Sequence, residues 1–358
     1  MSLHQQFVNS LHQQTDDSIR IIRFSLGVAI AIAIAFGFNW PLAFITPVFV
    51  TKFLGNRMAK LPFKALTGVL LVSVAAFIAG ILVTRFLLPF PIVFILVMTL
   101  LIFAISYWSY SGANDFVITM LLVGFTLVPM LGLAHQQVAS IVSISFLFSC
   151  FMAVLITMIM HELVPDKLAV IAEQKKQKLE IKRMETRFQL ALLSTIIIMP
   201  VVIFFFYFGL TNAILVLLFV AILAQKPDLL MGLQGAKALL VGNTLGGLCA
   251  IVMFNVLIVA PTYTFLVLVF AVVIVYFARL IFSESPLSPI YAMALTTVIV
   301  LISMGSLGDA NTGEKFYTRI FQIGCACGYV IFATFISRPW LTEIKDKYIQ
   351  STATIHRS

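Results

Sequence analysis

Long apolar runs separated by short polar segments dominate the pattern along this chain. The runs cover residues 21–38, 42–54, 64–87, 91–108, 116–133, 137–160, 188–208, 213–223, 236–259, 262–282, 290–304 and 316–336. Because a helix needs about 20 apolar residues to cross the hydrocarbon core of a bilayer, most of these runs are long enough to span a membrane. The pattern therefore predicts an all-α integral membrane protein of about twelve transmembrane helices.

The composition agrees with this interpretation, since 61% of the residues are hydrophobic and only 10% are charged. A soluble domain carries about 25% charged residues, so most of the surface of this protein must face lipid.

Positive charge is distributed unevenly around the predicted helices. The net charge of +9 raises the question of nucleic-acid binding, but the Lys and Arg residues lie between the apolar runs. With the N-terminus placed in the cytoplasm, only Arg85, Lys315 and Arg319 of the 23 Lys and Arg residues fall outside. Cytoplasmic segments of membrane proteins carry an excess of these residues. We therefore expect both termini to face the cytoplasm and no nucleic acid as a partner.

Short motifs recur in the two halves of the sequence. Arg23-Phe24, Lys64-Ala65 and Leu131-Gly132 have counterparts at Arg187-Phe188, Lys237-Ala238 and Leu307-Gly308. An even number of runs in each half gives both halves the same orientation, as in a parallel repeat. We predict a cytoplasmic N-terminal tail (1–19), a six-helix repeat (20–163), a basic cytoplasmic linker (164–186), a second six-helix repeat (187–338) and a cytoplasmic C-terminal tail (339–358).

The two shortest runs suggest a substrate-binding or translocation site. The second run contains Pro47 and Lys52, and the eighth is followed by Lys226 and Asp228. Short or proline-interrupted spans at matching places in two repeats are typical of transport sites. Paired ammonium groups would attract an organic anion, or would release a proton when desolvated. The alternatives are that the lysines extend toward lipid phosphates and that Asp228 simply pairs with Lys226.

Two further clusters are candidates for the same role. Asp115 follows Tyr110 at the entrance of the fifth run, where an acid and aromatic rings would bind an aromatic substrate. The alternative is an interfacial aromatic belt with a helix cap. Asp309 and Arg319 belong to the charged loop on the predicted periplasmic side, which is either an exit or docking site or a solvated loop with internal pairs.

The sequence offers no pattern typical of an enzyme or of a bound cofactor. The glycine-rich segment 242–247 lacks the lysine of a phosphate-binding loop and lies within an apolar run. Small residues in such a run favour close packing between helices. Since neither a nucleophile with its base nor the spacing of a metal site is present, we expect no catalysis, metal or cofactor.

Three stretches resemble a known family. RFSLGVAIAIAIAFGFNWPLAFITPVFVTKFLG and KALLVGNTLGGLCA are similar to segments of the bacterial fusaric-acid-resistance superfamily, and LGDANTGEKFYTRIFQIG resembles a compact, uncharacterised subfamily of inner-membrane transporters. The resemblance covers residues 20–338. It implies an inner-membrane exporter of small hydrophobic or aromatic organic acids or toxic compounds, working with a periplasmic membrane-fusion (adaptor) protein. Related plant anion channels use basic pore residues, which implies a role for Lys52 and Lys226.

We therefore expect export driven by the proton-motive force, with the lipid bilayer as surroundings and homo-oligomers as one possible assembly. Two alternatives stay open at this point. One is a passive organic-anion channel, and the other is a membrane assembly subunit that does not transport.

Overall fold

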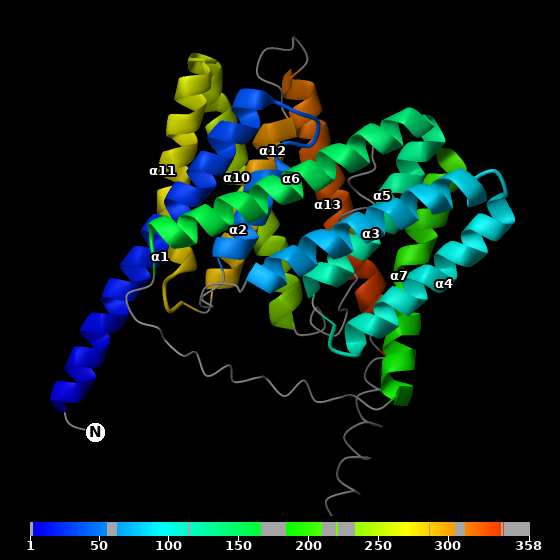
Figure 1. Ribbon diagram of the computed structural model, residues 1–358, viewed down its shortest axis with the longest axis horizontal. Helices are drawn as coiled ribbons and strands as arrows, with labels where there is room; N and C mark the ends of the chain where they lie inside the picture. The colour runs from blue at the N-terminus through cyan, green and yellow to red at the C-terminus, as the bar shows by residue number, and fades with distance from the viewer. Residues whose placement is uncertain are drawn as a thin grey trace, which may run out of the picture. The chain divides into compact units, whose positions relative to one another are not determined.

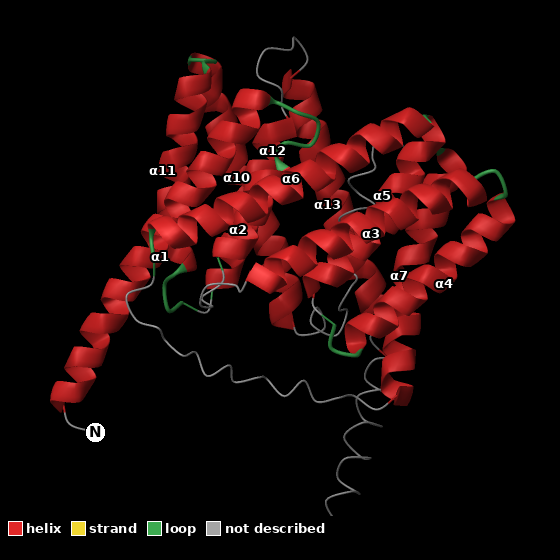
Figure 2. Ribbon diagram, in the orientation of Figure 1, coloured by secondary structure: helices red, strands yellow, loops and turns green. Residues whose placement is uncertain are grey.

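The computed structural model describes residues 3–55, 63–113, 115–165, 184–209, 220, 233–285, 287–304, 312–337 and 339, and every regular element within them is a helix (Figure 2). The helices are α1 (Leu3–Phe38), α2 (Ile45–Leu54), α3 (Phe63–Leu87), α4 (Pro91–Tyr110), α5 (Asp115–Ala134), α6 (Gln136–Leu163), α7 (Met184–Phe208), α10 (Leu233–Val259), α11 (Tyr263–Ile281), α12 (Ser288–Met304) and α13 (Thr312–Ile336) (Figure 1).

Seven helices of the described part are long and apolar enough to cross a membrane. Their spans are Asp17–Phe38, Leu70–Leu87, Pro91–Tyr110, Gln136–Leu163, Thr186–Phe208, Val241–Val259 and Tyr263–Ile281. Exposed side chains on them are large and apolar, such as Ile92, which is 85% exposed, and Val272, which is 71% exposed. The prediction of an all-helical, multi-pass membrane protein is confirmed.

The finer architecture stays a prediction. Apart from Val220, the apolar run at 213–223 lies outside the described residues, as does most of the linker at 164–186. Each of the other predicted runs coincides with a helix, but α2 and the apolar stretches Val117–Leu133 and Ser288–Ser303 are shorter than the seven spans. Neither the count of twelve nor the repeat is established by these helices. Helix α1 begins at Leu3, so it continues through much of the predicted N-terminal tail.

The chain forms two compact units, and each unit is assembled from separated segments. Unit 1 comprises Met1–Leu66, Ser145–Lys175 and Ala238–Ile320, and unit 2 comprises Thr67–Ile144, Lys176–Lys237 and Phe321–Ser358. Each unit therefore takes helices from both predicted sequence halves.

Unit 1 packs around one face of α1. Phe24, Val28, Ala31 and Ile32 follow the spacing of a helical face and are completely buried. In this unit α1 contacts α2 and α11, and α12 contacts α2 and α11. The ring centroids of Phe24 and Phe282 lie 5.7 Å apart, in an edge-to-face contact that closes the core.

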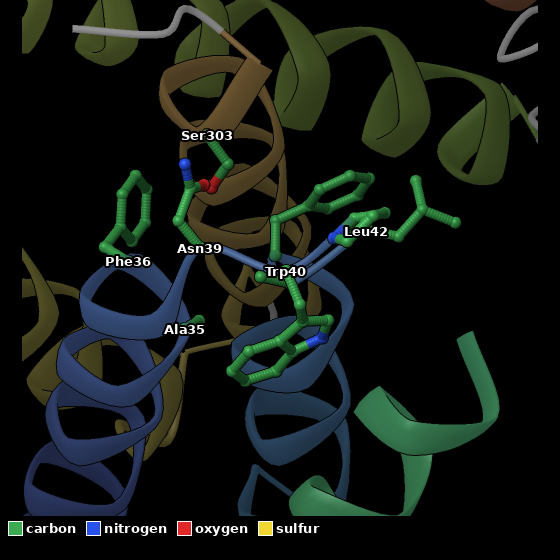
Figure 3. A pocket seen from close by; sticks show the side chains of 9 residues that line it. Ala35, Phe36, Asn39, Trp40, Leu42 and Ser303 are labelled. Atoms are coloured by element: carbon green, nitrogen blue, oxygen red, sulfur yellow. The ribbon is translucent and has the colours of Figure 1, made fainter. Parts of the chain in front are cut away.

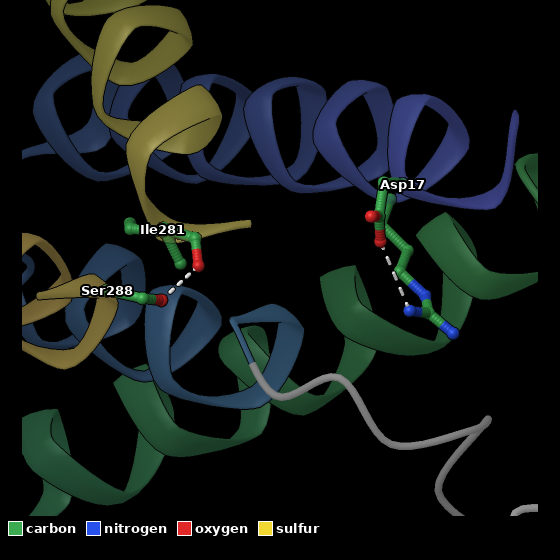
Figure 4. Close-up of polar contacts among 4 residues, drawn as sticks. Asp17, Ile281 and Ser288 are labelled. Carbon is green, nitrogen blue, oxygen red and sulfur yellow. Dashed lines mark hydrogen bonds and ion pairs between the residues drawn. The ribbon is translucent and has the colours of Figure 1, made fainter. Parts of the chain in front are cut away.

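Figure 4 shows two polar contacts within unit 1. The Ser288 hydroxyl donates to the Ile281 carbonyl and fixes the turn between α11 and α12. The Arg20 guanidinium lies 3.4 Å from the Asp17 carboxylate within α1. Since both side chains are partly exposed to solvent, this ion pair contributes little to stability.

Unit 2 is built on α4, α5 and α7. Phe94, Met98, Ile102 and Ile105 form the buried stripe of α4, and the Phe94 ring stacks on Phe206 of α7 with a centroid distance of 4.9 Å. Glycines allow α3 to approach α5 closely, because a Cβ at Gly124 would lie 2.8 Å from the Ala76 carbonyl oxygen.

The glycine-rich segment of α10 has the packing role predicted from the sequence. A Cβ at Gly242 would lie 3.1 Å from the Met293 sulfur, and one at Gly246 would lie 2.6 Å from the Ala294 carbonyl oxygen, both on α12. The Thr297 hydroxyl donates to the Asn243 side-chain oxygen across the same contact at 2.9 Å. The prediction is therefore confirmed for Gly242 and Gly246, whereas Gly247 faces open space.

Candidate functional site

The connection between α1 and α2, called the break below, is a sharp turn after which α2 folds back along α1, since a Cβ at Gly27 would meet Leu54 of α2. Helix α1 ends at Phe38, and the backbone then takes positive φ angles at Asn39 (44°) and Leu42 (59°). Asparagine tolerates this left-handed conformation, but for leucine it costs about 1–2 kcal/mol. Pro41 has no backbone N–H and cannot continue the helix. The surrounding structure must therefore hold this turn in place.

Helix α6 supplies that support through a buried serine. The Trp40 indole N–H donates to the Ser149 hydroxyl at 2.7 Å, and the Thr46 hydroxyl donates to the Ser149 carbonyl at 3.1 Å. The Ser149 hydroxyl lies 3.2 Å from the Leu42 carbonyl and 2.9 Å from the Ser145 carbonyl, so its one hydrogen is shared between them. The Trp40 ring also packs edge-on against Phe148. These contacts fix both ends of the break on one helix.

A pocket of about 380 Å³ opens at this break (Figure 3). Its lining consists of Ala35, Phe36, Asn39, Trp40, Pro41, Leu42, Ala43, Phe44 and Ser303. None of these nine lining residues is charged, and the aromatic rings come from both sides of the break. The volume lies at the lower end of the range for small-molecule sites, about 300–1,000 Å³. The pocket is therefore suited to a small ligand.

The predicted site residues are distributed differently. Pro47 is buried in the first turn of α2, three residues after the last pocket-lining residue of the break, Phe44. Lys52 is exposed in the last turn of α2, eight residues beyond Phe44 and therefore about 12 Å along the helix axis. Lys52 does not line the pocket. Its predicted partner Lys226 lies outside the described residues, as do Asp228 and Asp309.

The remaining candidates belong to other elements. The Tyr110 hydroxyl lies 3.1 Å from the buried Ser194 hydroxyl, so within unit 2 it links α4 to α7. Asp115 begins α5 and Arg319 lies in α13. The described structure thus brings Pro47 to the vicinity of the break, places Lys52 at the opposite end of α2, and gives Tyr110 a helix-packing contact.

Sequence reasoning missed three residues that the structure makes prominent. Trp40 and Ser149 form the central hydrogen bond of the break, and Arg23 is only 2% exposed on α1. The Arg23 guanidinium donates to the Val164 carbonyl at 3.3 Å, just beyond the last turn of α6. The signals were an Asn-Trp-Pro interruption for Trp40 and an arginine inside an apolar run for Arg23. No local signal distinguishes Ser149 from other serines of α6.

Removing the indole donor tests how the break is held. Trp40→Phe keeps a ring beside Phe148 but leaves the buried Ser149 hydroxyl without its donor, so we expect a loss of about 1 kcal/mol in stability. Thermal unfolding of the detergent-purified protein measures the effect. Trp108→Phe is the control, because Trp108 is 50% exposed. Equal losses in both variants would contradict the assigned hydrogen bond.

The fold defines the class of protein as an all-helical, multi-pass membrane protein. Within that class, residues 20–160 match the model of a family described as a protein of unknown function (DUF2955). The matched stretch contains Trp40, the break and Ser149. No curated protein and no solved structure matches the chain. The family description names no activity and does not mention fusaric acid resistance, so that resemblance stays a prediction.

Proposed function

We propose that this protein is a transporter of the bacterial inner membrane that exports small hydrophobic or aromatic organic acids or toxic compounds, with the α1–α2 break as part of the pathway. The observation that carries the proposal is the coincidence of a strained turn between α1 and α2 with a ligand-sized pocket. Unusually short, proline-containing apolar segments such as α2 point to the binding sites of transporters.

The physical argument concerns the exposed backbone at the break. In a membrane, irregular backbone is tolerated only where protein buries it or where it lines a cavity. Here the Leu42 carbonyl is bonded by Ser149, while Asn39, Pro41 and Leu42 line the pocket. A left-handed leucine held by a partly buried hydrogen bond is a strained arrangement, and such strain is concentrated at functional sites. A role in ligand binding accounts for a strained turn between α1 and α2.

The other parts of the proposal rest on the charge pattern and on the family resemblance. They are cytoplasmic termini, proton-motive-force coupling, a periplasmic adaptor partner, and attraction of anions toward the membrane by Lys52 and Lys226. A passive organic-anion channel and a non-transporting assembly subunit are the competing functions. A pump loses export when the proton gradient collapses, whereas a channel continues to conduct down the substrate gradient.

Growth of a deletion strain on a panel of aromatic acids and toxic hydrophobic compounds tests the proposal. The wild-type gene should restore tolerance, and Ser303→Phe, which fills the pocket, should lower the tolerated concentration about tenfold, as expected for a loss of about 1.4 kcal/mol in binding. Ser140→Phe on α6 is the matched control, because its hydroxyl is exposed and outside the pocket. Unchanged tolerance across the panel after deletion would exclude an exporter of these compounds.

A further inference from the structure

We infer that the pocket at the helix break binds its ligand in the uncharged form, as a small aromatic molecule with one neutral hydrogen-bonding group. A carboxylic acid would be bound in its protonated form, and amides or phenols in the uncharged form that they already have at neutral pH. The inference rests on the proposed function, since it specifies the substrate class of the same site.

The described part of the lining supplies no counter-charge for an ion. None of the nine described lining residues is acidic or basic, and the nearest cation of α2, Lys52, lies about 12 Å further along that helix. An ionised carboxylate that leaves water needs a paired charge or several hydrogen-bond donors in compensation. The nine described residues that line the pocket give such a carboxylate no paired charge.

The start of α2 does not replace the missing charge. Helix N-termini bind anions through backbone N–H groups that have no partner within the helix. In α2 the Ile45 N–H already donates to the Leu42 carbonyl at 3.0 Å, the Thr46 N–H donates to the Ala43 carbonyl at 3.1 Å, and Pro47 has no N–H. These first positions of the helix therefore offer an anion no free donor.

The polar groups of the pocket favour a ligand that carries its own hydrogen. The Ser303 hydroxyl donates to the Ile299 carbonyl at 2.6 Å, so only its lone pairs can face a ligand. The Asn39 amide both donates and accepts, and Figure 3 shows the polar ends of Asn39 and Ser303 on the same side of the pocket. A protonated acid or an amide satisfies both groups, whereas a carboxylate has no hydrogen to donate to Ser303.

Aromatic side chains complete the recognition. Phe36 at the end of α1, Trp40 in the break and Phe44 before α2 all line the pocket. Ring-on-ring contacts favour a flat aromatic body of one or two rings in a volume of about 380 Å³. The ligand is thus defined as a neutral aromatic compound with an O–H or N–H group.

Benzamide and benzoate are matched probes, because they share shape and differ in charge. The chain has three tryptophans, so Trp108→Phe together with Trp340→Phe leaves Trp40 as the sole fluorescent reporter at the pocket. At neutral pH we expect benzamide to quench this fluorescence at a concentration about tenfold lower than benzoate, a difference of about 1.4 kcal/mol. Acidification that protonates benzoate should remove the difference.

A second pair of variants tests the hydrogen-bond argument. Ser303→Val removes the acceptor and should weaken benzamide binding and narrow its preference over benzoate, whereas Ser140→Val should leave both unchanged. Equilibrium dialysis of labelled benzamide and benzoate with the wild-type protein gives the same comparison without the tryptophan substitutions. Tighter binding of benzoate, or binding that Ser303→Val does not alter, would overturn the inference.

The growth assay separates this result from the proposed function. If the wild-type gene restores tolerance but the purified protein prefers benzoate, the uncharged-ligand inference fails and the exporter proposal stands. If the gene confers no tolerance to any compound while benzamide binds at Trp40, the pocket is a ligand site and the exporter proposal fails.

Discussion

Replacing Gly246 by leucine should prevent α10 from packing on α12. A Cβ at this position would lie 2.6 Å from the Ala294 carbonyl oxygen and 2.7 Å from the Thr297 Cβ, and neither atom is the end of a flexible side chain. Overpacking of cores costs about 1–3 kcal/mol, and a clash with backbone belongs at the upper end. We expect a loss of about 3 kcal/mol and a fall of at least about 5 °C in melting temperature in detergent.

The neighbouring glycine is the matched control. Gly247 lies on the same helix, but nothing is found within 4 Å of a Cβ built there. Gly247→Leu should therefore unfold within a degree or two of the wild-type protein, since it adds an apolar side chain in open space and replaces a poor helix former. Similar losses for both variants would show that α10 does not use the Gly246 side for this contact.

Arg23→Ala should produce the second large loss of stability. The guanidinium is 2% exposed and donates to the Val164 carbonyl at 3.3 Å, at the negative end of the α6 dipole. Hydrogen bonds from charged groups contribute about 1.5–3 kcal/mol, and alanine leaves the carbonyl without this donor and the space of the side chain empty. We expect a loss of about 2–3 kcal/mol in detergent unfolding. Arg23→Lys keeps the positive charge but not the planar guanidinium group, so its loss of stability should lie between those of the wild-type protein and Arg23→Ala.

Arg279→Ala provides the comparison, because Arg279 is an exposed arginine in the last turn of α11 in the same unit. Its removal should change stability by no more than about 0.5 kcal/mol. If Arg23→Ala were as stable as Arg279→Ala, the buried contact with α6 would have no energetic role.

Much of the helical architecture could be predicted from the sequence, because a membrane-spanning helix is recognised by the length and apolarity of its segment. The end of the first helix near residue 38 could also be predicted, because Pro41 in Asn39-Trp40-Pro41 has no backbone N–H to continue a helix. The start of α2 at Ile45, rather than at residue 42, was not visible. Leu42 adopts a positive φ, and no side-chain preference of leucine signals that conformation.

The site itself could be predicted only in part. Pro47 was named from the sequence, but the partner of Trp40 is Ser149, which lies 109 positions further along the chain. Such a pairing depends on which helices meet, and hydropathy carries no information on that. Lys52 illustrates the converse, because its position in the sequence is suggestive while the structure leaves it exposed at the end of α2 opposite to the pocket.

The contact of α1 with α11 has a consequence for the order of events during synthesis. The Tyr263 hydroxyl donates to the Ala33 carbonyl at 2.7 Å across 230 positions of sequence. At about 5–20 residues per second, the ribosome needs roughly 10–50 s to make the intervening chain. During this interval the first segment must wait in the bilayer with lipid against the face of Phe24, Val28 and Ile32 that is later buried. Because these three side chains are apolar, their contact with lipid costs little, and insertion of α1 precedes its assembly with α11.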